Sequence, residues 1–547
     1  MVLYSVSAWL CRGPLRAVRF ASAPFCIILG ALMLLHAQLY APRFTPKPVA
    51  STPPVASHST RLAPTVAPLN DNDLTRYERA FSLQEDAQWD QADEALAELK
   101  DDVLLGAILA ERYLHPKYSS DYAELVMWLE NYADMPQASR IQALARNKKQ
   151  SGDSLKSYDV PSRRLAGVGT ADGMGQHNTP RSWHSGLDAW VAGDYKRAAG
   201  LFADAANHSQ NSKWANSAAH FWAYRASTQI GNHGQSAYHL RQAAASPYTL
   251  YGSIARHLLG DRRTVSMAAL PRVTHQVRNM AAVNRAAAYH ALGRTDDADN
   301  ELRYAYMMAD MQEKAQLTHI AGELDLPALQ LRMSQAIYRK ASATSALAYP
   351  MPRWLAARDV QADPALLYAI ARQESGFHTT ARSPAGARGV MQLMPKTASY
   401  VIRSFKLDEV QMASLEDSNV RINTISTQKL DDPRVNMMVG QHYVKYLQEK
   451  PYINGNLVYL LSAYNAGPAH LIDWSKRFSD ISDPLLFIEM IPFRETRHYV
   501  TQVLANYMIY GELLSGRQDI ASSLAQGHWP LLHSDSNTYS ASLAHLR

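Results

Sequence analysis

One carboxylate stands at the end of a short apolar helix. The sequence predicts that Asp363 caps this helix, with Pro364 at the first helical position, and that the helix runs to Glu374 and is stopped by Ser375 and Gly376. Glu374 follows Ile370 by four residues and Leu367 by seven, so helical spacing places it on the buried face. Because burial disfavours the anion, we expect a raised pKa and a side chain protonated at neutral pH. Such a group can act as a general acid.

Four further segments follow in a fixed order. Residues 386–395 form a glycine-rich turn that carries Met and Gln, and residues 432–440 open another helix. Residues 461–468 read Leu-Ser-Ala-Tyr-Asn-Ala-Gly-Pro, and residues 487–500 run from Phe-Ile-Glu-Met to His-Tyr-Val. Each segment alone is a weak signal. Together, after the Glu-Ser pair, they resemble the soluble lytic murein transglycosylase family, which has a lysozyme-like catalytic domain.

The resemblance implies a role for each matching residue. Glu374 would be the single catalytic acid and base. Glu489 matches an acidic position that contacts the glycan in the family and does not act as the nucleophile. Met391 has the alternative of filling a gap in the core, and Glu489 that of facing solvent. The substrate-binding positions implied along the sugar cleft and its wall are Ser375, Met391, Gln392, Tyr464, Asn465, Glu489 and Tyr499.

The number of carboxylates decides which reaction is expected. Most glycosidases use two, whereas these segments supply one well-placed acid. In murein the 6-hydroxyl of N-acetylmuramic acid can close onto C1, and the resemblance to the family implies a product with 1,6-anhydro ends. Two alternatives stay open: a hydrolase related to goose-type lysozyme or chitinases, and a non-catalytic helical scaffold that binds glycan. A hydrolase would need a second carboxylate, for which Asp408, Glu409, Glu416 and Asp417 are available.

The first 68 residues have the composition of an export segment followed by a linker. Three arginines precede an uncharged stretch from residue 20 to 42, which predicts a signal peptide over residues 1–41 and a periplasmic protein. An uncleaved stretch would instead anchor the protein in the inner membrane. Residues 42–68 are rich in proline and predict a linker. Both cysteines, Cys11 and Cys26, fall inside the export segment.

The remaining chain predicts an all-α fold. Residues 69–345 are alanine-rich and repeat a helix–glycine–helix pattern at Gly193 and Gly293, which favours a superhelix of stacked helix pairs similar to tetratricopeptide repeats. Residues 346–515 would form the catalytic domain and residues 516–547 a polar tail. We expect no cofactor and no metal. The net charge of +6 is not concentrated in one block, and no nucleic-acid motif occurs. The expected partners are peptidoglycan strands and, through the helical region, other cell-wall enzymes.

Overall fold

A computed structural model describes most of the chain after residue 68. The described residues are 69–158, 160, 165–167, 180–208, 212–261, 270–338, 345–355, 360, 362–407 and 427–532. The predicted export segment, the linker and both cysteines lie outside these residues. The acidic residues between 408 and 417 that the hydrolase alternative requires also lie outside them.

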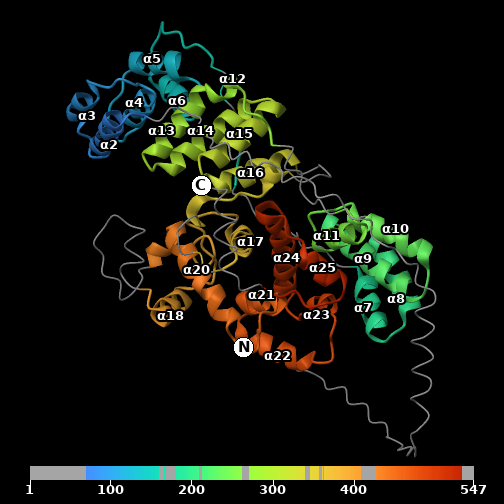
Figure 1. The fold of residues 1–547 in the computed structure, drawn as a ribbon. Coiled ribbons are helices and arrows are strands. Elements are labelled where there is room, and N and C mark those ends of the chain that lie inside the picture. The colour runs from blue at the N-terminus through green and yellow to red at the C-terminus, as the bar shows by residue number, and fades with distance from the viewer. Residues whose placement is uncertain are drawn as a thin grey trace, which may run out of the picture. The chain divides into compact units, whose positions relative to one another are not determined.

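The prediction of an all-α fold is confirmed. In the described ranges, extended backbone pairs only as isolated bridges and forms no strand. None of the described helices is both long and apolar enough to cross a membrane. The described helices before residue 345 (Figure 1) are α2 (Asp71–Glu85), α3 (Trp89–Leu96), α4 (Leu105–Tyr113), α5 (Tyr122–Tyr132), α6 (Ala138–Lys148), α7 (Arg181–Val191), α8 (Tyr195–Ala206), α9 (Lys213–Gln229), α10 (His233–Ala244), α11 (Leu250–Leu258), α12 (His275–Arg278), α13 (Ala281–Ala291), α14 (Thr295–Met308), α15 (Met311–Glu323) and α16 (Pro327–Tyr338).

Helix pairs recur in this region, as the glycine pattern predicts. α7 packs on α8, α9 on α10, and α13 on α14. The turns between them contain Gly193, Gly231 and Gly293, whose φ angles are 75°, 70° and 69°. Residues with a Cβ rarely adopt this left-handed backbone, so glycine allows each chain reversal within a few residues.

The helical region contributes to two different hydrophobic cores. Helices α2–α6 bury their apolar side chains together with α12–α16, and in Figure 1 these two groups lie side by side. Helices α7–α11 instead share a core with the residues after 345. Among them, α11 packs against α24 (Arg494–Ser515) and α25 (Asp519–Ala525). The middle five helices are therefore part of the support for the C-terminal region.

The C-terminal region surrounds one long buried helix. Helix α17 packs along α24, which is buried from Tyr499 to Gly511. The elements of this region are η2 (Ala346–Ala348), η3 (Arg353–Leu355), α17 (Pro364–Ser375), α18 (Pro395–Phe405), η4 (Thr427–Asp431), α20 (Pro433–Gln448), α21 (Leu457–Ala466), α22 (Pro468–Arg477), α23 (Pro484–Met490), α24 and α25.

The packed C-terminal region extends beyond the boundary expected at residue 515. α25 buries Ile520 and Leu524, and the Arg517 guanidinium lies 2.6 Å from the Asp363 carboxylate at the start of α17. The backbone N–H of Leu457 donates to the carbonyl of Pro530. A polar tail can therefore begin only after residue 532. The available signal in the sequence was the spacing of Ile520, Ala521 and Leu524, which share one helix face.

Candidate active site

The local sequence of α17 brings Glu374 to the end of a buried helix. The Asp363 side chain accepts a hydrogen bond from Ala365 N–H, with proline in the first turn, as predicted. Leu367 and Ile370 are fully buried. Gly376 ends the helix with φ 59°. Glu374 itself is half-buried, so the helix carries it from the core to a position that solvent still reaches.

The glycine-rich turn is held against α20 by a buried asparagine. Asn436 of α20 accepts a hydrogen bond from Met391 N–H at 2.9 Å and donates to the carbonyls of Arg388 and Leu430 at 3.0 and 2.8 Å. A Cβ at Gly389 would lie 2.1 Å from the Asn436 amide, and its φ is 76°. Glycine is required here because both the close approach and the backbone angle exclude larger residues.

Three tyrosines lie together beside Glu374. The rings of Tyr464 and Tyr499 are nearly parallel, with centroids 6.3 Å apart, and Tyr443 lies 5.3 Å from Tyr464. The Tyr464 hydroxyl donates to the carbonyl of Met391 at 2.9 Å, which ties α21 to the glycine-rich turn. We call these three tyrosines and Glu374 the Glu374 site.

Burial raises the pKa of Glu374 to about 8. The Tyr499 hydroxyl partly opposes this shift by hydrogen bonding to the carboxyl, while the negative charge of Glu495 adds to it. The bond from Tyr499 is weak, because its buried hydroxyl has no partner of full hydrogen-bond geometry within the described residues. Catalytic hydrogen bonds are often long before substrate binds. At neutral pH the protonated acid therefore predominates, which confirms the direction predicted from burial.

Three of the predicted sugar-binding residues make contacts that shape the turn. The Ser375 hydroxyl donates to the carbonyl of Val390 at 2.8 Å. Gln392 has φ 47°, and its side-chain amide donates to the carbonyl of Gly389 at 2.8 Å. Met391 is fully buried, and its sulfur fills the space left by Gly440 in α20. Their roles in binding sugar stay predictions, and for Met391 the burial favours the core interpretation.

Asn465 links two helices of the site. Its side-chain oxygen accepts a hydrogen bond of 2.6 Å from the Thr496 hydroxyl, near the start of α24. Asn465 follows Tyr464 directly, and Thr496 lies one turn before Tyr499. The bond therefore fixes the relative position of the two helices that carry the parallel tyrosine rings.

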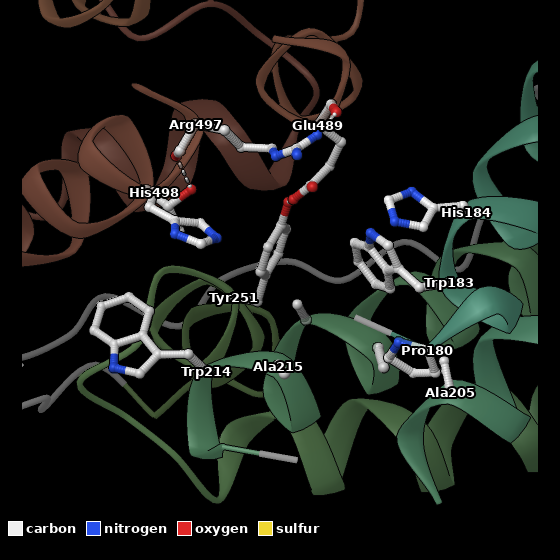
Figure 2. Close-up of a pocket in the computed structure, with 13 residues that line it drawn as sticks. Pro180, Trp183, His184, Ala205, Trp214, Ala215, Tyr251, Glu489, Arg497 and His498 are labelled. Carbon is white, nitrogen blue, oxygen red and sulfur yellow. Dashed lines mark hydrogen bonds between the residues drawn. The ribbon is translucent and has the colours of Figure 1, made fainter. Parts of the chain in front are cut away.

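Glu489 lies in a different environment from the one expected for a cleft residue. It is buried at the end of α23 and accepts a hydrogen bond of 2.5 Å from the Tyr251 hydroxyl of α11. Figure 2 shows the tyrosine pointing at the carboxyl, with Arg497 beside it. A cavity of about 90 Å³ borders this contact and is lined on its helical side by Trp183 and Trp214. Burial raises the pKa of Glu489, and Arg497 and Tyr251 oppose the shift. Contact with glycan stays a prediction.

The sequence did not single out two residues that act on the site. Asn436 organises the glycine-rich turn, and only its place in a helix-start motif was visible beforehand. Glu495 is an exposed carboxylate that raises the pKa of Glu374. Its position one turn before Tyr499 on α24 was the available signal, since residues four apart share a helix face.

Comparison with known families agrees with this geometry. Residues 355–485 match the model of the transglycosylase SLT domain, and residues 490–519 match that of the soluble lytic transglycosylase helical domain. A soluble lytic murein transglycosylase of Escherichia coli K12 is 33% identical over 159 residues, 29% of this chain and 22% of that protein. A putative soluble lytic murein transglycosylase of Haemophilus influenzae is 35% identical over 151 residues, 28% and 22% of the two chains. The matched segment thus spans about a fifth of these relatives.

Solved structures extend the likeness of the fold beyond that segment. The 70 kDa soluble lytic transglycosylase of Escherichia coli matches with a TM-score of 0.55 at 15% identity, covering 85% of this chain and all of that one. The complex of the 70 kDa soluble lytic transglycosylase with bulgecin A matches with a TM-score of 0.52 at 19% identity, covering 84% and 65%. At these identities the match concerns the fold alone. Residues 355–485 thus resemble a transglycosylase SLT domain, and the resemblance of this chain to the soluble lytic murein transglycosylase family is confirmed.

Proposed function

We propose that this protein is a lytic murein transglycosylase that cleaves the β-1,4 bond between N-acetylmuramic acid and N-acetylglucosamine in peptidoglycan. The observation that carries the proposal is Glu374, whose pKa burial raises to about 8. It stands at the surface end of a buried helix of an SLT domain. The curated relatives that share this segment are named soluble lytic murein transglycosylases.

One carboxyl group suffices for a balanced reaction. Protonated Glu374 donates its proton to the leaving glycosidic oxygen while the bond from that oxygen to C1 breaks. The 6-hydroxyl oxygen of the same muramic residue then forms a bond to C1, and its proton passes to the Glu374 carboxylate. The acid is regenerated, no water is consumed, and the product carries a 1,6-anhydro ring.

The three tyrosines have separate tasks in this scheme. The Tyr499 hydroxyl, which bonds weakly to the carboxyl before substrate binds, stabilises the carboxylate formed after proton donation. Tyr464 holds the glycine-rich turn through the carbonyl of Met391. Tyr443 packs on Tyr464 and excludes water from that side. A carboxylate in such surroundings regains a proton readily, which favours the second step.

A hydrolase is the second candidate, and Glu495 is the observation that favours it. This carboxylate acts electrostatically on Glu374 from the start of α24. A second carboxylate can activate water in an inverting glycosidase. Glu495 is exposed, so water can reach its carboxylate, as the activation of water requires.

The mass of the products separates the two reactions. Purified sacculi are digested with the wild-type protein and with Glu495→Gln, and the released muropeptides are analysed by mass spectrometry. We expect the mass of every new muramic end to be lower by one water. The substitution should leave the product unchanged and the rate within a few-fold of the wild-type rate. Products of full hydrolytic mass that disappear in Glu495→Gln would establish the hydrolase instead.

The cell compartment and the binding role of Glu489 complete the proposal. Peptidoglycan lies outside the inner membrane, so we place the protein in the periplasm, in accord with its amino-terminal sequence. Replacing Glu489 with alanine is expected to raise KM more than it lowers kcat, because the resemblance assigns this residue to glycan binding. Steady-state rates with soluble glycan strands measure the two constants.

A further inference from the structure

A second cavity lies in the N-terminal helical body, in the core formed by α2–α6 with α12–α16. Its volume is about 470 Å³, within the range of small-molecule sites. It is enclosed by the ends of α2 and α4, the start of α6, and one side of α13 and α14. Its apolar lining residues Ala110, Leu114 and Tyr289 belong to or pack against a hydrophobic core that the Glu374 site does not share.

Four carboxylates line this cavity: Glu85, Glu111, Asp297 and Glu301. The lining also includes Arg140 and His115, so the balance of formal charge is negative with neutral histidine. An acidic lining alone does not identify a binding site, because carboxylates are often paired with arginines behind them.

Two arginines do stand behind these carboxylates, but each is shared between two acids. Arg294 pairs with Glu111 at 2.6 Å and with Asp297 at 2.7 Å. In the second group, Arg285 lies 2.9 Å from Glu301 and 2.9 Å from Asp134. Each group holds two carboxylates for one guanidinium. One negative charge per group is therefore left without a neutralising partner when both acids are ionised.

The second observation is an unsatisfied acceptor inside the cavity wall. The Glu301 side chain is 1% exposed. Its Oε2 accepts from Arg285, whereas its Oε1 is buried and has no hydrogen-bond partner in the described part of the chain. The side-chain oxygen of Gln137, across the same cavity, is also buried without a partner there. Buried acceptors without donors are rare, because each costs free energy of about 1–3 kcal/mol.

We propose that this cavity binds a primary alkylammonium group, with its N–H donors directed at Glu301 and Gln137. An ammonium carries three donors and one positive charge, so it satisfies both orphan oxygens and offsets the excess of carboxylates. Anions are excluded by the charge of the lining, and neutral apolar groups would leave both acceptors unsatisfied. The site takes either a free polyamine or a lysine side chain of a polypeptide.

The test measures binding of two amines to the full-length protein by isothermal titration calorimetry. 1,5-Diaminopentane represents a free polyamine, and Nα-acetyl-lysine amide represents a lysine side chain. Nα-acetyl-norleucine amide is the uncharged control of nearly equal shape. We expect at least one amine to bind with an affinity that falls as salt is added, and the norleucine compound not to bind. The amine that binds more tightly shows whether the ligand is a free polyamine or a lysine side chain of a polypeptide.

Substitutions then locate the amine. Glu301→Gln is expected to weaken binding by on the order of tenfold, since it removes a charge-assisted hydrogen bond, and Gln137→Met to weaken it less. The matched control is Glu130→Gln, an exposed acid on α5 of the same helical body that does not line the cavity. Thermal unfolding checks that each variant folds. If Glu301→Gln does not fold, Glu85→Gln at the exposed end of α2 replaces it. No binding by either amine, or equal loss in Glu130→Gln and the cavity variants, would overturn the proposal.

Discussion

Two glutamates of the C-terminal region, the half-buried Glu374 and the buried Glu489, differ in what surrounds them. Burial raises the pKa of both carboxyls. Glu374 keeps part of its surface open, and within the described residues no cation acts on its pKa. Glu489 is almost completely buried, is bonded by Tyr251, and has Arg497 beside it.

The difference shows how one domain uses the same side chain in two ways. A carboxyl that lacks a cation keeps its proton and can give it to a substrate. A carboxyl with a tyrosine donor and a nearby guanidinium has partners inside the protein, and the bond from Tyr251 to Glu489 joins α11 to α23. Desolvation therefore does not define a catalytic acid by itself. The partners decide whether a proton is available.

The largest effect should come from removing the available proton. Glu374→Gln keeps the shape of the side chain but cannot donate or accept, so murein cleavage should fall by at least a hundredfold to ten-thousandfold. Glycan binding and the circular dichroism spectrum should stay unchanged. Release of soluble muropeptides from sacculi measures the loss. Activity within a few-fold of wild type would remove Glu374 from the mechanism.

Loss of the hydrogen bond to Glu489 should lower the free energy of unfolding of the protein. Tyr251→Phe removes the hydroxyl that bonds Glu489 and leaves a buried carboxyl less satisfied, at a cost of about 1–3 kcal/mol in the free energy of unfolding. Denaturant unfolding measures this change, with Tyr238→Phe as control, since Tyr238 is 46% exposed on the neighbouring α10. Equal stability of the two variants would show that the bond to Glu489 contributes nothing.

The stability of Glu374→Gln relative to wild type should depend on pH. The folded pKa of Glu374 is raised above its unfolded value, so its contribution to stability is fully present below pH 4.5 and is lost as pH rises through about 8. Glutamine has no such loss. Between pH 5 and 9, the free energy of unfolding of the variant should therefore rise relative to that of wild type, by on the order of 1 kcal/mol after allowance for solvent screening. Melting temperatures across this range test the sign, and a constant difference would contradict the raised pKa.

The smallest effect concerns the pH at which activity declines. Because the protonated acid is the active form, kcat/KM should fall as pH rises through about 8. Glu495 raises this pKa by charge repulsion, so Glu495→Gln should move the alkaline limb to lower pH by a fraction of a unit. Glu512→Gln, near the far end of the same helix, serves as the control. A shift to higher pH would mean that Glu495 acts through something other than its charge.

The sequence alone determined the local features of the site. Asp363, the following proline and Gly376 act on neighbouring backbone, so the bounds of α17 could be predicted from residue types. The glycine turns of the helix pairs were predictable for the same reason, since a left-handed backbone at Gly193 or Gly293 depends on no distant contact. Burial of Glu374 followed from helical spacing.

The tertiary structure alone decided which distant residues meet. The bond between Tyr251 and Glu489 joins residues 238 positions apart, and no periodicity of either helix specifies its partner. The same applies to Asn436 beneath the glycine-rich turn and to the packing of α25, whose apolar face does not by itself specify the helix that it contacts. Helical patterns fix the face that a residue occupies. The element that this face meets depends on packing and buried hydrogen bonds across the whole chain.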